Sequence, residues 1–146
     1  MSPSSIDAAK QELTKDIGSP KVEALVEAMF LAATADGVID PSELGRLSAT
    51  LEALTHKSLS AETAQAILDE LSVKLRADGR AARLAAVAAR LSGEKARETA
   101  LLLAASIAKS DGVVRERENY LLADLAEALA IPQGRAVELI ANVTAS

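Results

Sequence analysis

Apolar residues recur every three or four positions along most of this chain, which is the spacing of one face of an α-helix. Between Pro20 and Gly37, one such face would carry Val22, Leu25, Val26, Met29, Phe30 and Ala33. Glycine, proline and Asp-Gly pairs interrupt the pattern and indicate turns. We therefore expect about seven to eight short helices, covering residues 6–16, 20–36, 41–55, 60–78, 81–91, 94–109 and 116–129 and a last segment after Pro132. In that last segment, the residues expected to face inward are Val137, Leu139 or Ile140, and Val143.

Capping residues mark several of the predicted helix starts. Ser19-Pro20 offers a serine N-cap followed by proline at the first helical position. Residues 40–43, Asp-Pro-Ser-Glu, form a capping box with an acidic N-cap and a glutamate three positions later. Ser60 is suited to cap the helix that follows it. The sequence therefore predicts where helices begin as well as how many there are.

The composition favours the same fold class. Alanine and leucine, the best apolar helix formers, dominate the 49% of residues that are apolar, and only Phe30 and Tyr120 are aromatic. A chain of 146 residues is long enough for one hydrophobic core, and it contains no long linker. We predict an all-α protein with a flexible tail at residues 1–4 and a single helical domain at residues 5–146.

A short signature occurs twice, 75 positions apart. Residues 34–43 read TADGVIDPSE and residues 109–118 read KSDGVVRERE. Each copy places Asp-Gly at the end of an alanine-rich stretch, with a glutamate seven positions after the aspartate; Asp78-Gly79 has no such glutamate. We interpret residues 28–55 and 103–130 as duplicated helix-turn-helix motifs related by pseudo-two-fold symmetry.

The signatures supply carboxylates at the turns, which we call the acidic corners. The candidate ligands are Asp36, Asp40 and Glu43 in the first corner and Asp111 and Glu118 in the second. Carboxylate oxygens suit a hard divalent cation such as calcium or magnesium. A purely structural interpretation stays open, because the same residues can cap helices and end them.

Comparison with the EF-hand calcium loop limits the cation hypothesis. Glu43 and Asp40 match loop positions 12 and 9, but Ala32 and Thr34 stand at positions 1 and 3, where ligands are needed. A true EF-hand is not expected, although a weaker site could form if the corners pool their carboxylates. Arg115 replaces Asp40 in the second copy, so we expect the first corner to bind cations better.

Several function classes lack the residues they need. The chain has no cysteine and one histidine, His56, which disfavours thiolate chemistry and the usual zinc centres. A net charge of −5 argues against nucleic-acid binding, and no apolar run is long enough to span a membrane. We expect a cytoplasmic protein. Basic residues gather in the middle of the chain: Arg76, Arg80, Arg83, Arg90, Lys95 and Arg97. We interpret them as a solvated basic face. The alternative is a docking surface for an acidic protein partner or for anionic lipid, which would allow peripheral membrane association.

Residues 32–47, and more closely residues 108–112 continuing to Leu129-Ala130-Ile131-Pro132, resemble the TerB family of tellurite-resistance proteins. Similar domains begin certain membrane-anchored DnaJ-type co-chaperones. The resemblance covers residues 21–132 and implies an all-helical, cytoplasmic bacterial protein in a metal-linked stress response, with divalent cations at the acidic turns. Arg115 departs from the family pattern at the second turn.

We therefore predict a non-enzymatic TerB-like module that binds a divalent cation, protein partners, or both, at its acidic corners. One alternative is an interaction scaffold that holds no metal. Another is a hydrolase that uses paired carboxylates, which the chain supports poorly because it carries no nucleophile motif and no phosphate-binding glycine loop.

Overall fold

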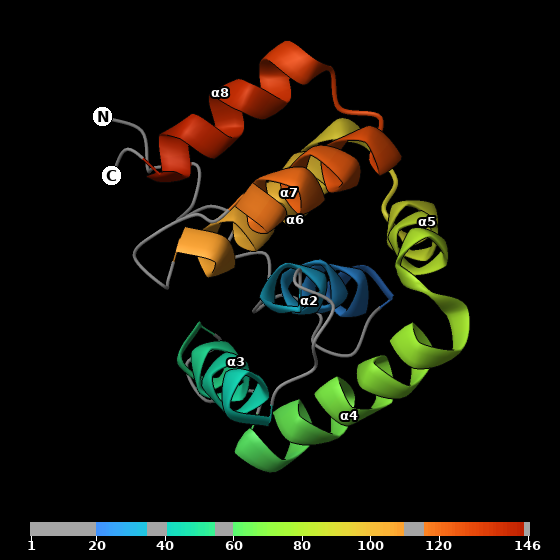
Figure 1. Ribbon diagram of the computed structural model, residues 1–146, viewed down its shortest axis with the longest axis vertical. Helices are drawn as coiled ribbons and strands as arrows, with labels where there is room; N and C mark the ends of the chain where they lie inside the picture. Colours follow the sequence, from blue (N-terminus) through green and yellow to red (C-terminus); the bar gives the residue numbers. More distant parts are fainter. Residues whose placement is uncertain (1–19, 35–40, 55–59, 110–115, 145–146) are drawn as a thin grey trace.

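The computed structural model describes residues 20–34, 41–54, 60–109 and 116–144 (Figure 1). Within these ranges the chain forms seven α-helices and no strand: α2 (Pro20–Ala33), α3 (Pro41–Leu54), α4 (Ala61–Asp78), α5 (Arg80–Arg90), α6 (Glu94–Lys109), α7 (Glu116–Ala128) and α8 (Gln133–Thr144). The prediction of an all-α protein is confirmed. The helix expected at residues 6–16 and the tail at residues 1–4 lie outside the described residues.

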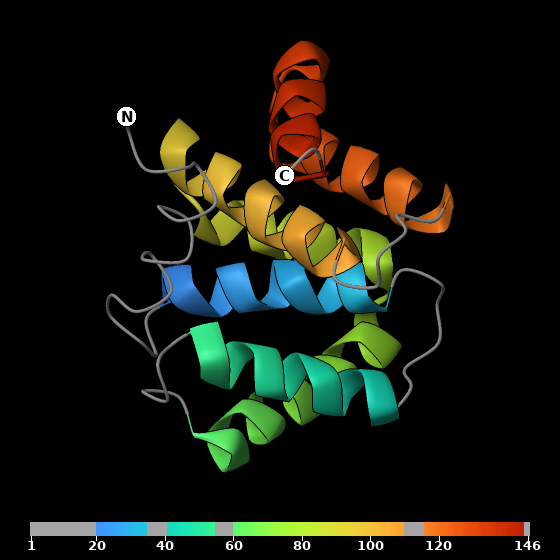
Figure 2. The ribbon, with the colours of Figure 1, turned by 90° about the vertical axis from the view of Figure 1, so that its left-hand side faces the viewer.

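Helix α2 lies at the centre of the arrangement (Figures 1 and 2). Its most extensive packing partner is α6, and it also contacts α5, α3, α7 and α4. Helices α6 and α7 cover one side of α2, and α3 and α4 cover the other, while α8 packs on the outside of α6 (Figure 2). The hydrophobic core therefore surrounds a single helix that the other helices enclose.

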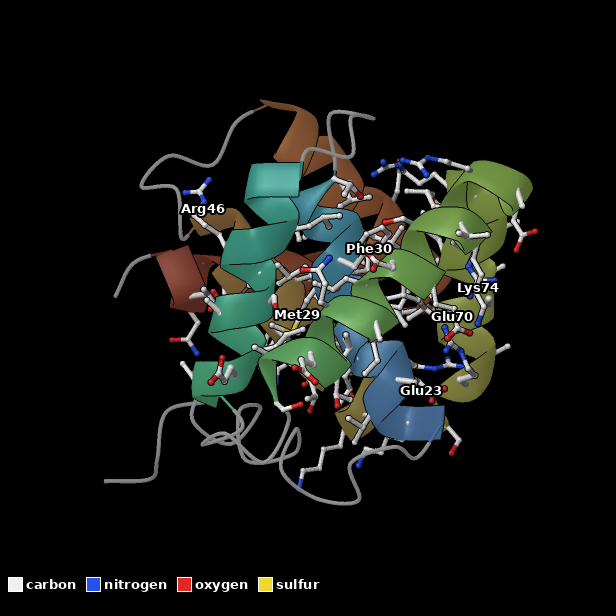
Figure 3. The ribbon with its side chains drawn as sticks, turned by 90° about the horizontal axis from the view of Figure 1, so that it is seen from below. Glu23, Met29, Phe30, Arg46, Glu70 and Lys74 are labelled. Carbon is white, nitrogen blue, oxygen red and sulfur yellow. The ribbon has the colours of Figure 1, made fainter. Side chains whose placement is uncertain are left out.

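The sequence of α2 explains its central position. Ten residues of α2 are buried: Val22 and every residue from Ala24 to Ala32. The helix is therefore buried on all its faces, whereas a surface helix is buried along one face only. Met29 and Phe30, predicted to be core residues, have no solvent exposure and lie beneath α3 and α4 in Figure 3. Leucines and alanines of α6 meet this surface, and the small size of the alanines allows the two helices to pack closely.

The helix boundaries follow the sequence signals closely. Ser60 caps α4 through its hydroxyl oxygen, which accepts a hydrogen bond from the Thr63 backbone amide at 3.2 Å. Glu94 and Glu116 begin α6 and α7 as predicted. One inward position was predicted wrongly: Val137 is 60% exposed, and Ala136 is buried in its place. The duplication of the two halves is not established by the described residues and stays a prediction.

Helix α7 ends in a Schellman motif whose left-handed residue is an alanine. Ala130 has φ 57°. The Ile131 amide donates to the Ala126 carbonyl at 2.9 Å, and the Ala130 amide donates to the Glu127 carbonyl at 3.0 Å. These bonds satisfy carbonyls that the helix would otherwise leave open, and Pro132 then prevents the helix from continuing. Glycine is the usual residue at this position, so the alanine carries backbone strain.

Helices α4 and α5 meet at one residue, Gly79. With φ 86° it adopts a backbone conformation that favours glycine. Its amide donates to the Leu75 carbonyl at the end of α4, and its carbonyl accepts from the Arg83 amide in α5. The single residue therefore sets the angle at which α5 approaches α2.

Candidate functional site: the acidic corners and the arginines beside them

The acidic corners lie largely outside the residues that the structure describes. Asp36 and Asp40 fall within residues 35–40, and Asp111 falls within residues 110–115. Glu43 and Glu118 belong to the first turns of α3 and α7, but their side chains are not described. The structure therefore describes the helices that flank the predicted ligands but not the ligands themselves, and the ligand set stays a prediction.

Four helix ends that flank the corners lie on one side of the molecule. Helices α2 and α6 pack against each other and run in the same direction, so their last turns lie at the same end (Figure 2). The first turns of α3 and α7 lie at that end too (Figure 2). The first corner connects α2 to α3, and the second connects α6 to α7. The helix ends to which the two corners are attached therefore all lie on this side of the molecule.

Arg80 of α5 binds the carbonyl end of α2, directly before the first corner. Its Nη1 donates to the Leu31 carbonyl at 3.3 Å, and its Nη2 donates to the Thr34 carbonyl. Thr34 is fully buried, and its hydroxyl donates to the Phe30 carbonyl at 3.0 Å. The guanidinium thereby satisfies carbonyls at a helix C-terminus, where the helix dipole favours a positive charge.

A buried carboxylate lies further along the same pair of helices. Glu27 of α2 has no solvent exposure. Arg83 donates from Nε to Glu27 Oε2 at 2.6 Å and from Nη2 to Glu27 Oε1 at 2.8 Å, and Arg90 Nη2 donates to Oε1 as well. Arg83 Nη1 also donates to Asp78 Oδ2 at 3.0 Å. We call Glu27, Asp78, Arg83 and Arg90 the Glu27 cluster.

The charges of the Glu27 cluster balance, with two carboxylates against two guanidinium groups. Hydrogen bonding to Glu27 is the main cause that raises the pKa of Arg83 above its usual range; burial acts in the opposite direction, and Asp78 adds to the rise. Paired, bidentate hydrogen bonds of this kind allow a charge to be buried. The cluster therefore anchors α5 to α2 and has no unmatched charge to offer a ligand.

The expectation of a solvated basic face is wrong for four of its six residues. Arg80, Arg83 and Arg90 bind α2, as described above. Arg97 donates from Nε to the Leu91 carbonyl at 3.1 Å and from Nη1 to the Leu129 carbonyl at 3.2 Å. Arg76 and Lys95 are exposed as expected. The arginines mainly join helices together, because their planar groups reach several acceptors at once.

The sequence contains two features that indicate the Glu27 cluster, although the overall composition does not reveal them. Glu27 is the one charged residue in the apolar run from Ala24 to Ala33, where a carboxylate can be buried only if it is paired. Arg83 and Arg90 are seven residues apart and so lie on one face of α5. Their combination predicts a buried ion pair between two helices.

The described residues place limits on other kinds of site. Among them, no three acidic or histidine side chains converge so that they could hold a metal ion. In the same ranges, no helix has both the length and the apolar character that crossing a membrane requires. His56 lies outside the described residues.

Comparison with known protein families identifies the chain. The family model described as tellurite resistance protein TerB matches residues 22–140. The chain belongs to the TerB family. The match spans both acidic corners, all three helix-joining arginines of α5 and most of the helical domain. No curated protein and no solved structure matches the chain. The similarity of this TerB protein to DnaJ-type co-chaperones stays a prediction.

Proposed function

We propose that this TerB-family protein is a non-enzymatic, cytoplasmic module of tellurite resistance that binds a divalent cation, calcium or magnesium, at its acidic corners. The ligands would be Asp36, Asp40 and Glu43, joined by Asp111 and Glu118 from the second corner. Occupancy of the corners would then control how the module binds protein partners.

The observation that carries the proposal is the shared side of the flanking helix ends. Neither signature alone has enough oxygen ligands for calcium, which takes six to eight. Helices α2 and α6 end, and α3 and α7 begin, on one side of the molecule (Figure 2). This arrangement supports pooling of carboxylates from both corners. The carbonyl ends of α2 and α6 also favour a cation there, because each carries a partial negative charge.

Arg80 limits the strength of such a site. Its guanidinium lies on the Thr34 carbonyl, two residues before Asp36. A positive charge so close reduces the attraction that the corner exerts on a cation. The protein would therefore bind a divalent cation weakly and reversibly, which suits a sensor better than a permanent structural site.

Titration calorimetry tests the proposal. Wild-type protein is titrated with calcium, magnesium and manganese chlorides, alongside the double variant Asp36→Asn/Glu43→Gln and its second-corner counterpart Asp111→Asn/Glu118→Gln. We expect wild-type binding below about 1 mM, and both variants to bind more weakly, the first-corner variant most of all. Glu62→Gln is the matched control, since Glu62 is an exposed glutamate in the first turn of α4, which no signature precedes.

Two outcomes would contradict the proposal. If wild type binds no ion below about 1 mM, the corners are capping elements and the protein is a metal-free interaction scaffold. If the ion binds but both corner variants bind it as wild type does, the site lies elsewhere.

A further inference from the structure

A groove lies between α5 and α7 on the side of α5 that faces away from α2. Its volume is about 640 Å³. Leu84 forms its buried floor, and Ala81, Ala85 and Ala89 are exposed along it. Ala128 of α7 lies on the opposite wall. Helices α5 and α7 contact each other.

The groove has an apolar wall because α5 turns its charged side chains inward. Arg80, Arg83 and Arg90 are all engaged with α2 or its neighbours. The outward face keeps alanines at positions 81, 85, 88 and 89, which is the spacing of one helical face. A solvent-exposed helix normally presents charged or polar residues on that face. The described part of α5 presents none along the groove.

Small side chains make this wall suitable for another helix. Alanine lets two helix backbones approach to the short end of the usual range of about 8–10 Å. An exposed apolar face flanked by polar residues is typical of a surface that binds another protein. The geometry corresponds to recognition of a helix in a groove, in which one apolar face of the incoming helix enters.

The charge on the rim indicates the chemistry of the partner. Asp124 and Glu127 line the groove from α7 and are exposed, and their side chains form no hydrogen bond or ion pair with the described residues. They are three residues apart and so lie on neighbouring positions of one helix surface. Arg97 also lines the groove, but it donates to the carbonyls of Leu91 and Leu129. Within the described residues, the rim therefore offers two carboxylates without an ion-pair partner, beside one arginine whose charge the carbonyls do not neutralise.

We propose that this groove binds an amphipathic helix of another protein, with alanine or leucine on its apolar face and lysine or arginine positioned to meet Asp124 and Glu127. The carboxylates disfavour an anionic lipid surface, because like charges repel. None of the residues that line the groove belongs to the proposed cation ligands, so the proposal does not rest on cation binding.

A synthetic helical peptide tests the proposal. The probe is a fluorescein-labelled helix with an alanine and leucine face and two lysines three residues apart; its charge-reversed copy carries glutamates instead. Fluorescence anisotropy on full-length protein should show binding of the lysine peptide only. Asp124→Asn/Glu127→Gln should weaken that binding about tenfold, since two exposed ion pairs are lost.

Matched variants distinguish the groove from the rest of the surface. Ala85→Glu should abolish peptide binding by filling the groove, whereas Ala82→Glu, exposed on the same helix but not lining the groove, should leave it unchanged. Glu23→Gln/Glu62→Gln removes the same total charge from exposed positions elsewhere and should also have no effect. Circular dichroism confirms that each variant folds.

Three results would overturn the proposal. Equal binding of the lysine and glutamate peptides would remove the role of the rim carboxylates. Lysine-peptide binding that survives Ala85→Glu, or no binding of either peptide, would show that the groove takes no such helix. Dimerisation in sedimentation experiments that is lost in Ala85→Glu would mean that a second copy of this chain occupies the groove.

Discussion

Arg83 holds Glu27 through two hydrogen bonds of 2.6 and 2.8 Å, although the two residues are 56 positions apart in the chain. Glu27 has no solvent exposure, and the side chain of Arg83 retains only 11%. The pair joins the central helix α2 to α5. It also turns the arginines of α5 inward, which leaves the alanine face of α5 outside.

Removing one partner of this pair should destabilise the fold severely. Arg83→Ala leaves Glu27 buried with a single cationic partner, Arg90, and we expect a loss of about 3–5 kcal/mol in the free energy of unfolding. Urea denaturation followed by circular dichroism measures it. Arg76→Ala, an exposed arginine in α4, is the control and should change stability by less than about 0.5 kcal/mol. Equal effects of the two substitutions would contradict the structural role of the pair.

Glycine at position 130 should stabilise the protein. Ala130 has φ 57°, a conformation that costs an L-residue roughly 1–2 kcal/mol and glycine almost nothing. We expect Ala130→Gly to raise the free energy of unfolding by about 1 kcal/mol, after the greater entropy of glycine in the unfolded chain is counted. Ala123→Gly, at an exposed position inside α7, should instead lower it by about 1 kcal/mol. Thermal unfolding of both variants shows whether the two changes in stability have opposite signs. A loss of stability in both would contradict backbone strain at Ala130.

Neutralising Arg80 should strengthen the proposed cation site. In Arg80→Gln the positive charge beside the Thr34 carbonyl is lost, and the affinity for calcium should rise about fivefold, equivalent to roughly 1 kcal/mol. Calorimetry on Arg80→Gln and on the exposed control Arg76→Gln measures the difference. Unchanged or weaker binding in Arg80→Gln would show that the arginine does not oppose the cation.

The ion pair between α6 and α8 predicts a pH dependence. Hydrogen bonding from Arg135 lowers the pKa of Glu98 in the folded protein, with distances of 2.9 and 3.1 Å. Because the folded pKa is below the unfolded one, the stabilisation is present above the unfolded pKa of about 4.3 and is lost as pH falls through the folded value. Wild type should therefore melt at a higher temperature than Glu98→Gln at pH 7, and the difference should shrink towards pH 3. A difference in melting temperature that grows as the pH falls would contradict the predicted direction of the Glu98 pKa shift.

The periodicity of apolar residues predicted the helices well, because their ends coincide with strong local signals. Ser60, Gly79 and Pro132 each act through the backbone of their own segment, so their effect can be read without knowledge of the tertiary structure. Val137 was misplaced for a different reason: α8 offers several apolar positions, and only its packing on α6 decides which face turns inward.

The arginines of α5 were harder to interpret from sequence. A run of basic residues most often forms a solvated surface, and this expectation ignores what faces the helix. Arg80 binds carbonyls at the end of α2, and Arg83 and Arg90 bind Glu27 in its middle, so their roles depend on how α5 crosses α2. For the acidic corners, the sequence predicts which carboxylates are candidate ligands. Only the fold shows that α2 and α6 run in the same direction (Figure 2).

The direct joint between α4 and α5 makes the spacing of this region rigid. Each residue turns a helix by about 100°, and Gly79 is the only residue between the two helices. Adding one residue just after it would rotate α5 so that alanines took the places of Arg83 and Arg90 beside Glu27, and deleting one would put leucines there. The buried carboxylate would lose its counter-charges at once, so this segment can tolerate changes of side chain far more readily than changes of length.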